Sequence, residues 1–143
     1  MSPGFRTALV DSGVNGTSVT TGVLDGGTAR INVYTGAQPT NANDAATGTL
    51  LGTLTPSSDV FAAAVTGAAA LNAVSADTSA DASGTAGYVR FFRTGDTAPG
   101  SAGVTADRRM DLAIGTDIAM DNTAVVAGGQ ISLSGWTLTL PTG

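Results

Sequence analysis

Apolar and polar residues alternate along several short segments of this chain, which is the pattern of half-buried β-strands. In Thr28–Thr35, Ile31 and Val33 share one face. The segment Thr85–Thr94 alternates most clearly, with Tyr88, Arg90 and Phe92 on one face and Val89, Phe91 and Arg93 on the other. Further strands are predicted at Thr49–Thr55, Val60–Val65, Ala68–Val74, Met110–Gly115, Ile118–Val125 and Gln130–Leu140.

Turn-forming residues separate these segments. Thr66-Gly67 predicts a hairpin turn, whereas Ser75–Gly84 and Gly95–Ala106 predict loops. About seven to eight strands with turns every ~8–12 residues are typical of a single-domain, all-β fold, namely an antiparallel β-sandwich or jelly roll. We assign this domain to residues 28–143. Residues 1–27 are interrupted by glycine and predict a loose N-terminal arm.

Composition supports the all-β prediction. The chain has 143 residues, which fits one domain. All its acidic residues are Asp and all its basic residues are Arg. Asp favours turns, whereas the missing Glu and Lys favour helix interiors. The few aromatic residues fall mainly in predicted strands, so we expect Phe91 and Trp136 to pack in the core.

The usual catalytic and metal-binding side chains are missing, since the chain contains no His and no Cys. A triad-type base is therefore lacking, and we expect no enzyme activity, cofactor or metal site. Pairs of Asp residues could in principle act in hydrolysis or bind a hard cation. The more economical interpretation is that these side chains cap their own turns. The candidates are Asp107 with Asp111, Asp77 with Asp81, and Asp117 with Asp121 and Asn122.

Charge and hydropathy exclude further classes. The net charge of −5 argues against nucleic-acid binding, which needs a basic surface. Arg108 and Arg109 are adjacent, but Asp107 and Asp111 flank them, which predicts a solvated turn rather than a phosphate site. No apolar run is long enough for a membrane span, and the N-terminus does not resemble a signal peptide.

An ordered set of strand and turn motifs resembles a family of small Ala/Gly/Thr-rich virion structural proteins of tailed bacteriophages. In that family a strand ends in Y-[ST]-G-x-Q-P, an Ala/Asp loop and G-T-L-L follow, and an aromatic strand and a closing strand come later. The similarity covers roughly residues 28–141. The matching segments here are Tyr34–Pro39, Gly48–Leu51, Asn72–Ala86, Tyr88–Arg93 and Ile131–Pro141.

The resemblance implies a virion component, and we favour a capsid decoration (cement) protein. Such a protein is made in the host cytoplasm, binds the outside of the assembled head and bridges capsomers. The implied partners are the major capsid protein and further copies of this chain, with a trimer favoured. The N-terminal arm or the Gly95–Arg109 loop would reach the shell, and the expected contact residues are Arg108, Arg109, Phe5 and Arg6.

Three alternatives remain open at this point. The chain could be a tail, neck or baseplate protein of the same particle, because composition does not separate these locations. It could be a receptor- or carbohydrate-binding module, which would need a concave aromatic surface. An Asp-based hydrolase would need two close carboxylates in a pocket.

Overall fold

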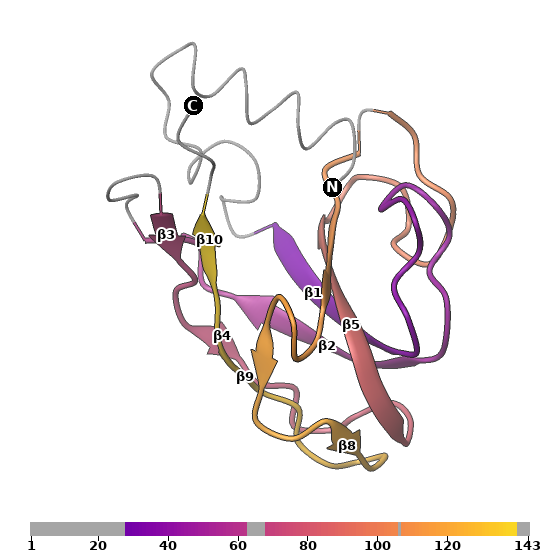
Figure 1. Ribbon diagram of the computed structural model, residues 1–143, viewed down its shortest axis with the longest axis vertical. Coiled ribbons are helices and arrows are strands. Elements are labelled where there is room, and N and C mark those ends of the chain that lie inside the picture. Colours follow the sequence, from indigo (N-terminus) through magenta and orange to yellow (C-terminus); the bar gives the residue numbers. More distant parts are fainter. Residues whose placement is uncertain (1–27, 63–67, 106, 140–143) are drawn as a thin grey trace.

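The computed structural model describes residues 28–62, 68–105 and 107–139, and this part of the chain is all-β, with strands and no helix (Figure 1). The predicted arm, residues 1–27, lies outside the described residues. The strands are β1 (Ala29–Thr35), β2 (Leu50–Pro56), β3 (Ala68–Ala70), β4 (Val74–Ser75), β5 (Gly84–Arg93), β6 (Met110–Ala113), β7 (Ala119–Met120), β8 (Ala124–Val125), β9 (Leu133–Gly135) and β10 (Thr137–Thr139).

The main sheet has the strand order β4-β2-β1-β5-β6, and β8 pairs with the beginning of β5. Every pairing in it is antiparallel. Two further antiparallel pairs, β3 with β10 and β7 with β9, are separate from this sheet. The long strands β1 and β5 lie at the centre of the main sheet, and they correspond to the two clearest alternating patterns in the sequence.

The register sorts the side chains of the main sheet into two faces. On one face, Ile31 lies between Leu54 and Phe91, and Val33 lies opposite Val89. These side chains are fully buried and form the apolar core. The core is completed by residues from the short strands and their connections, including Phe61, Ile118, Ile131 and the partly buried Trp136.

The opposite face of the same sheet is polar but is also buried. Cross-strand neighbours here are Asn32 with Arg90 and Tyr34 with Tyr88. All four side chains are buried, and the two tyrosine rings are stacked with centroids 5.2 Å apart. The loops after β1 and β5 lie on this side of the sheet, whereas β3, β9 and β10 lie on the other side (Figure 1).

Four of the eight predicted strands are confirmed. The segments predicted at 28–35, 49–55 and 85–94 match β1, β2 and β5 to within one residue at either end. The strand predicted at 110–115 forms as β6 but ends two residues earlier. Long alternating patterns were sufficient here because each of these strands pairs over most of its length.

Two predicted strands are wrong because each is divided into two. The segment 118–125 forms β7 and β8, which pair with different partners, β9 and β5. Between them the side chain of Asn122 accepts a hydrogen bond from the N–H of Ala124 and forms a turn. The segment 130–140 forms β9 and β10, and β9 ends at Gly135, whose φ of 132° is unfavourable for residues with a side chain.

The predicted hairpin between residues 60 and 74 is confirmed in its pairing but not in its strand lengths. Phe61 and Leu71 form an antiparallel bridge, and the N–H of Ala62 donates to the carbonyl of Ala70. The predicted turn at Thr66-Gly67 lies outside the described residues. Residues beyond the bridge pair elsewhere, β3 with β10 and β4 with β2, so this segment joins separate parts of the fold.

A close backbone contact fixes the turn that ends β1. Gly36 has a φ of 74°, in the left-handed region. Its carbonyl oxygen lies where a side chain at Gly87 would be, because a Cβ built at Gly87 would lie 1.9 Å from that oxygen. Both positions therefore require glycine, one for its conformation and the other for the close approach.

Candidate functional site

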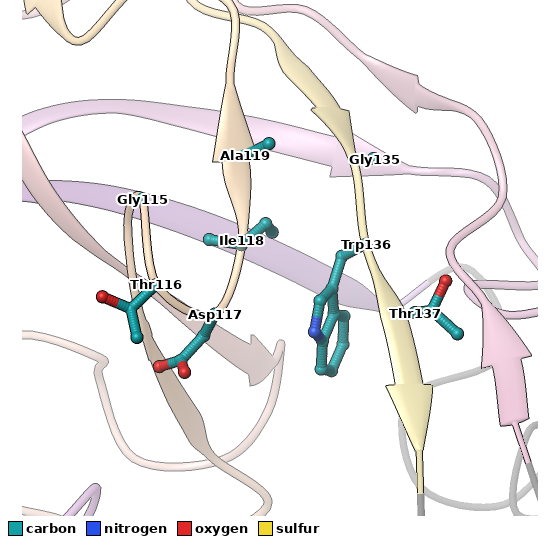
Figure 2. Close-up of a pocket in the computed structure, with 8 residues that line it drawn as sticks. All are labelled: Gly115, Thr116, Asp117, Ile118, Ala119, Gly135, Trp136 and Thr137. Atoms are coloured by element: carbon teal, nitrogen blue, oxygen red, sulfur yellow. The ribbon is translucent and has the colours of Figure 1, made fainter.

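Two regions of the described structure are candidates for interaction, and the first is a shallow cleft of about 350 Å³. It lies between the turn Gly115–Ala119 and the segment Gly135–Thr137. Figure 2 shows the indole of Trp136 beside this turn, with its nitrogen on the side of Asp117. The prediction that Trp136 packs in the core is only partly right, because its ring contacts Phe61 but part of the side chain remains exposed.

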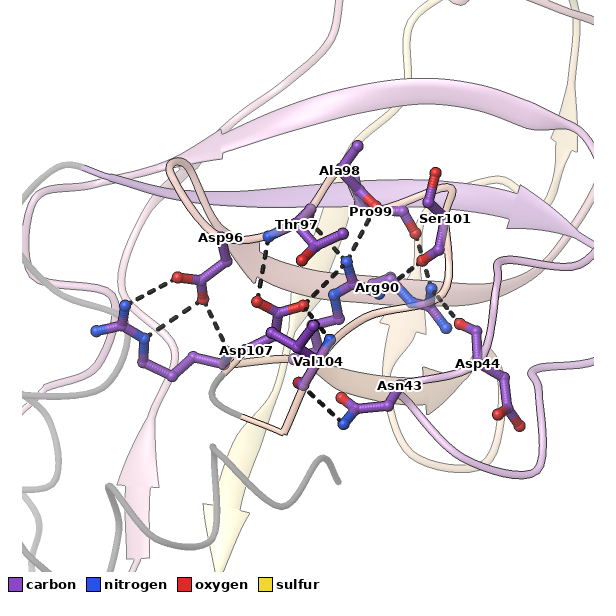
Figure 3. Close-up of polar contacts among 12 residues, drawn as sticks. Asn43, Asp44, Arg90, Asp96, Thr97, Ala98, Pro99, Ser101, Val104 and Asp107 are labelled. Atoms are coloured by element: carbon purple, nitrogen blue, oxygen red, sulfur yellow. Dashed lines mark hydrogen bonds and ion pairs between the residues drawn. The ribbon is translucent and has the colours of Figure 1, made fainter.

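The second region is the loop of residues 95–109, which folds back over the polar face of the main sheet (Figure 3). Its sequence is rich in Gly and Ala and offers few large apolar side chains for anchoring. Polar contacts take their place. Two arginines with no exposed side-chain surface, Arg90 and Arg109, donate hydrogen bonds to the interior side of the loop.

Arg90 projects from the middle of β5 and joins three segments. Its Nε and Nη2 donate to the two carboxylate oxygens of Asp111 on β6, each at 2.7 Å. Its Nη1 donates to the carbonyl oxygens of Asp44 at 3.0 Å and Pro99 at 2.8 Å. The guanidinium therefore forms a bidentate ion pair within the sheet and also anchors one residue in each of the two covering loops.

Arg109 forms a second anchor within the loop itself. Its Nη2 donates to the carbonyl oxygens of Thr97 and Ala98 at 2.7 and 3.0 Å, and its Nη1 donates to Ser101 at 2.8 Å. The same guanidinium lies 3.4 Å from a carboxylate oxygen of Asp107. Carbonyls that face the interior of an irregular loop are thus satisfied by one planar donor group.

Two carboxylates complete the loop. Asp107 accepts hydrogen bonds from the N–H groups of Thr97 and Val104, at 3.1 and 2.9 Å. Asp96 accepts from the backbone N–H of Arg108 and forms an ion pair with its side chain at 2.8 Å. Each carboxylate joins residues at opposite ends of the loop, so its two ends are held together (Figure 3).

The loop of residues 40–48 is hydrogen-bonded both to the loop of residues 95–109 and to the main sheet. The N–H of Gly103 donates to the carbonyl of Asn43, and the Asn43 side chain donates to the carbonyl of Val104. The phenol of Tyr88 donates to the carbonyl of Thr47 and accepts from its N–H. The two loops are therefore hydrogen-bonded to each other and to the sheet below.

The electrostatic environment keeps these groups charged. Burial opposes the charged form of Arg90, but the hydrogen bonds to Asp111 outweigh it and raise the pKa of the guanidinium. Burial likewise opposes ionisation of Asp107, but backbone donors and Arg109 lower the pKa of its carboxyl below the ordinary value. Burial lowers the pKa of Arg109, yet an arginine remains protonated at neutral pH.

The predicted contact residues are placed as follows. Arg108 is partly exposed, with 31% of its side chain accessible, and its partner contact stays a prediction. The expectation of a solvated turn is wrong for Arg109, whose side chain has no exposed surface, so its visible role is to shape the loop. Phe5 and Arg6 lie outside the described residues, and their predicted contacts are untested.

Sequence reasoning missed the function of Arg90, which it assigned only to one face of a strand. An Arg flanked by aromatic residues in a strand, with an Asp in the next strand, is a weak signal for a buried ion pair. The ion pair could be recognised only from the strand register, which places Arg90 opposite Asp111. The predicted pair Asp107–Asp111 serves as two separate partners for arginine, one for Arg109 and the other for Arg90.

Among the other candidates, Asp77 and Asp117 cap turns as predicted, whereas the Asp121 carboxylate accepts from the hydroxyl of Ser132. Asp77 accepts from the N–H groups of Ser79 and Thr53, and Asp117 accepts from the N–H of Ala113. Within residues 28–62, 68–105 and 107–139, no three acidic side chains are grouped so that they could hold a metal ion. In the same ranges no helix has the length and apolar character needed to cross a membrane.

The rigid loop presents one large apolar side chain to solvent. Val104 is 59% exposed, although its backbone is held by Asp107 and Asn43. The other strongly exposed valine, Val126 at 68%, follows β8 on a different part of the fold. Comparisons with protein-family models, curated proteins and solved structures give no match to this chain.

Proposed function

We propose that this chain is a structural protein of a tailed-bacteriophage virion, and specifically a capsid decoration (cement) protein. It binds the outside of the assembled head and bridges neighbouring capsomers. Binding only to the assembled shell stabilises that state by mass action. The proposal includes no catalytic role, and it keeps the β-sandwich or jelly-roll arrangement as the fold class.

The observation that carries the proposal is the ordered set of motifs that resembles phage virion proteins. Several of these motifs coincide with structural features of this chain. The segment Tyr34–Pro39 ends β1 and contains Gly36, which has a positive φ. The segment Tyr88–Arg93 is most of the central strand β5. The resemblance thus involves residues with structural roles, rather than composition alone.

The loop of residues 95–109, which is held by hydrogen bonds and ion pairs, supports the proposal because it can serve as a docking surface. A loop that is already ordered loses little conformational entropy on binding, so its contacts contribute more of their energy to affinity. Val104 and the partly exposed Arg108 are its candidate contact residues. The major capsid protein is the proposed partner, and a trimer of this chain, with Phe5 and Arg6 as further contacts, is the proposed assembly.

Co-sedimentation with capsids tests this function. Heads of the phage that encodes this chain, prepared without the protein, are incubated with the purified full chain and then heated. We expect saturable binding at a fixed ratio to the major capsid protein and a higher temperature of shell disruption. Absence of binding to capsids would overturn the cement role, and binding to purified tails instead would favour the tail, neck or baseplate alternative.

Two exposed valines provide a matched pair of variants for the same assay. Val104→Gln changes the loop surface, and Val126→Gln changes a position outside the loop that is also strongly exposed. We expect about tenfold weaker capsid binding for Val104→Gln, because the variant loses one apolar contact with the capsid. We expect little change for Val126→Gln. Equal affinities of the two variants would exclude the loop as the docking surface, even if the capsid binding itself were confirmed.

A further inference from the structure

We propose that the cleft between the Gly115–Ala119 turn and Gly135–Thr137 binds one unit of a neutral saccharide. The sugar would lie against the indole of Trp136 and form hydrogen bonds with the Asp117 carboxylate and the indole N–H. None of the residues that line this cleft belongs to the loop of residues 95–109, so the proposal does not depend on the capsid role. It would give the protein a glycan-binding activity in addition to its structural one.

Trp136 has the position and support of a sugar-stacking residue. Its ring is held by the rings of Phe61 and Phe91, with centroids 5.5 and 5.6 Å away. It nevertheless keeps part of its surface exposed toward the cleft. Among the described residues its indole N–H has no hydrogen-bond acceptor. A fixed, partly exposed tryptophan combines an apolar surface with an unused donor, which suits the mixed apolar and polar surface of a sugar.

The turn opposite supplies polar groups whose orientation is already fixed. Oδ2 of Asp117 accepts a hydrogen bond from the N–H of Ala113 at 2.9 Å, and the backbone N–H of Asp117 donates to the carbonyl of Ala113. These two bonds hold the exposed carboxylate in place while its other oxygen can accept from a sugar hydroxyl. Thr116 in the same turn is also exposed, but its hydroxyl points away from Trp136 (Figure 2).

The size and charge of the cleft limit the ligand. A volume of about 350 Å³ is at the low end of the ~300–1,000 Å³ range of ligand pockets, which suits a single sugar unit. The Asp117 carboxylate and the net charge of −5 disfavour an acidic sugar. A neutral hexose or N-acetylhexosamine, free or at the end of a glycan, therefore fits better than a uronic or sialic acid.

Trp136 is the only tryptophan in the chain, so its fluorescence reports directly on this cleft. The full chain is titrated with glucose, galactose, N-acetylglucosamine and galacturonate, and saturation-transfer NMR on the same samples detects binding without a fluorescence change. We expect saturable binding of at least one neutral sugar with a Kd on the order of 1 mM. Galacturonate should bind at least ~10-fold more weakly than its neutral counterpart galactose.

Matched variants locate the binding. Asp117→Asn keeps an oxygen that can accept from Ala113 but removes the charge, and it should weaken sugar binding about tenfold. Asp59→Asn removes an exposed carboxylate outside the cleft and should leave the affinity unchanged. The proposal is overturned if no neutral sugar binds by either readout up to about 50 mM. It is also overturned if both variants bind equally well.

Discussion

The two faces of the sheet formed by β1, β2, β5 and β6 are both buried, but by different means. On one face apolar side chains such as Phe91 and Val89 pack in a continuous core. On the other face Arg90 forms an ion pair with Asp111 within the sheet, and the covering loops are attached to Arg90 through hydrogen bonds. One face therefore depends on apolar area and the other on the satisfaction of polar groups.

The difference predicts different consequences when each face is damaged. Apolar packing is non-directional, so its loss affects the whole domain in proportion to the area and cavity involved. A polar network holds particular atoms in particular places, so its loss frees the loop before it unfolds the sheet. The neighbouring residues Phe91 and Arg90, on opposite faces of β5, allow this contrast to be measured directly.

Phe91→Ala should have the largest effect. Phe91 is fully buried and contacts the ring of Trp136, so its truncation leaves a cavity that costs about 4 kcal/mol of unfolding free energy. Urea denaturation of the wild type and the variant measures this loss. Phe91→Leu keeps most of the volume and should cost about 1.5 kcal/mol or less, which preserves the test if the alanine variant does not fold. A loss below about 1 kcal/mol for Phe91→Ala would contradict the assigned core.

Arg90→Met should cost slightly less, about 3 kcal/mol, and should act differently. The change leaves the carboxylate of Asp111 buried without its cation and removes two donors to the covering loops. Hydrogen exchange should become faster at the amides of Gly103 and Ala46, which join the two loops, before it does so in β1. The same exchange rates throughout the domain would show that the two faces unfold as one unit.

Arg93→Met is the matched control for this experiment. Arg93 lies on the same strand, is only partly buried and donates from its Nε to the hydroxyl of Thr28. Its replacement should cost about 1 kcal/mol or less and leave exchange in the loops unchanged. A similar loss of loop protection in both variants would attribute the effect to β5 in general and not to the anchoring by Arg90.

The apolar face was largely predictable from the sequence, whereas the polar face was not. Alternation in β1 and β5 placed Ile31, Val33 and Phe91 correctly because a period of two residues directly encodes which side chains share a face. The same alternation placed Arg90 on the opposite face but did not indicate that this face is buried. Burial of that face depends in part on the loop of residues 40–48. Its Asp44 is 46 residues away from Arg90 in sequence, and no local pattern encodes such a contact.

The candidate sites also contain features that the sequence could not predict. Arg108 and Arg109 are adjacent in sequence and chemically equivalent, yet only Arg108 keeps exposed surface. The strand predicted over 130–140 concealed the Trp136 cleft, because Trp136 occupies the break between β9 and β10. Sequence reasoning treated this segment as continuous because a single glycine inside an alternating run does not reveal whether the chain changes partner there.

Two glycines of the loop provide a smaller and more selective test. A Cβ added at Gly103 would lie 2.6 Å from the Asp107 carboxylate and 2.8 Å from the Arg109 guanidinium, whereas a Cβ at Gly100 would meet nothing within 4 Å. Gly103→Ala should therefore cost about 2 kcal/mol and Gly100→Ala close to zero. Urea midpoints of the two variants measure this difference. Equal midpoints would mean that the anchor around Arg109 yields easily and does not hold the loop rigidly.

Acid sensitivity is the smallest expected effect, and it isolates a single carboxylate of the polar face. Burial raises the pKa of Asp107, but the N–H groups of Thr97 and Val104 and the charge of Arg109 outweigh this and lower it below the ordinary value of 3.8. The unfolded chain then takes up the proton at higher pH than the folded one. The stabilisation by ionised Asp107 is therefore complete above the unfolded-state pKa and is lost as the pH falls through the folded-state pKa.

Asp107→Asn separates this contribution from that of the other carboxylates. The variant keeps an oxygen that can accept a backbone hydrogen bond but has no charge to titrate. Its urea midpoint should lie below that of the wild type at neutral pH, and the two should converge as the pH falls below about 4. A difference that stayed constant across this range would mean that shape and hydrogen bonding, rather than the charge of Asp107, hold the loop. The loss of stability in Phe91→Ala should not depend on pH in this way, because the apolar side chains packed around Phe91 carry no titratable group.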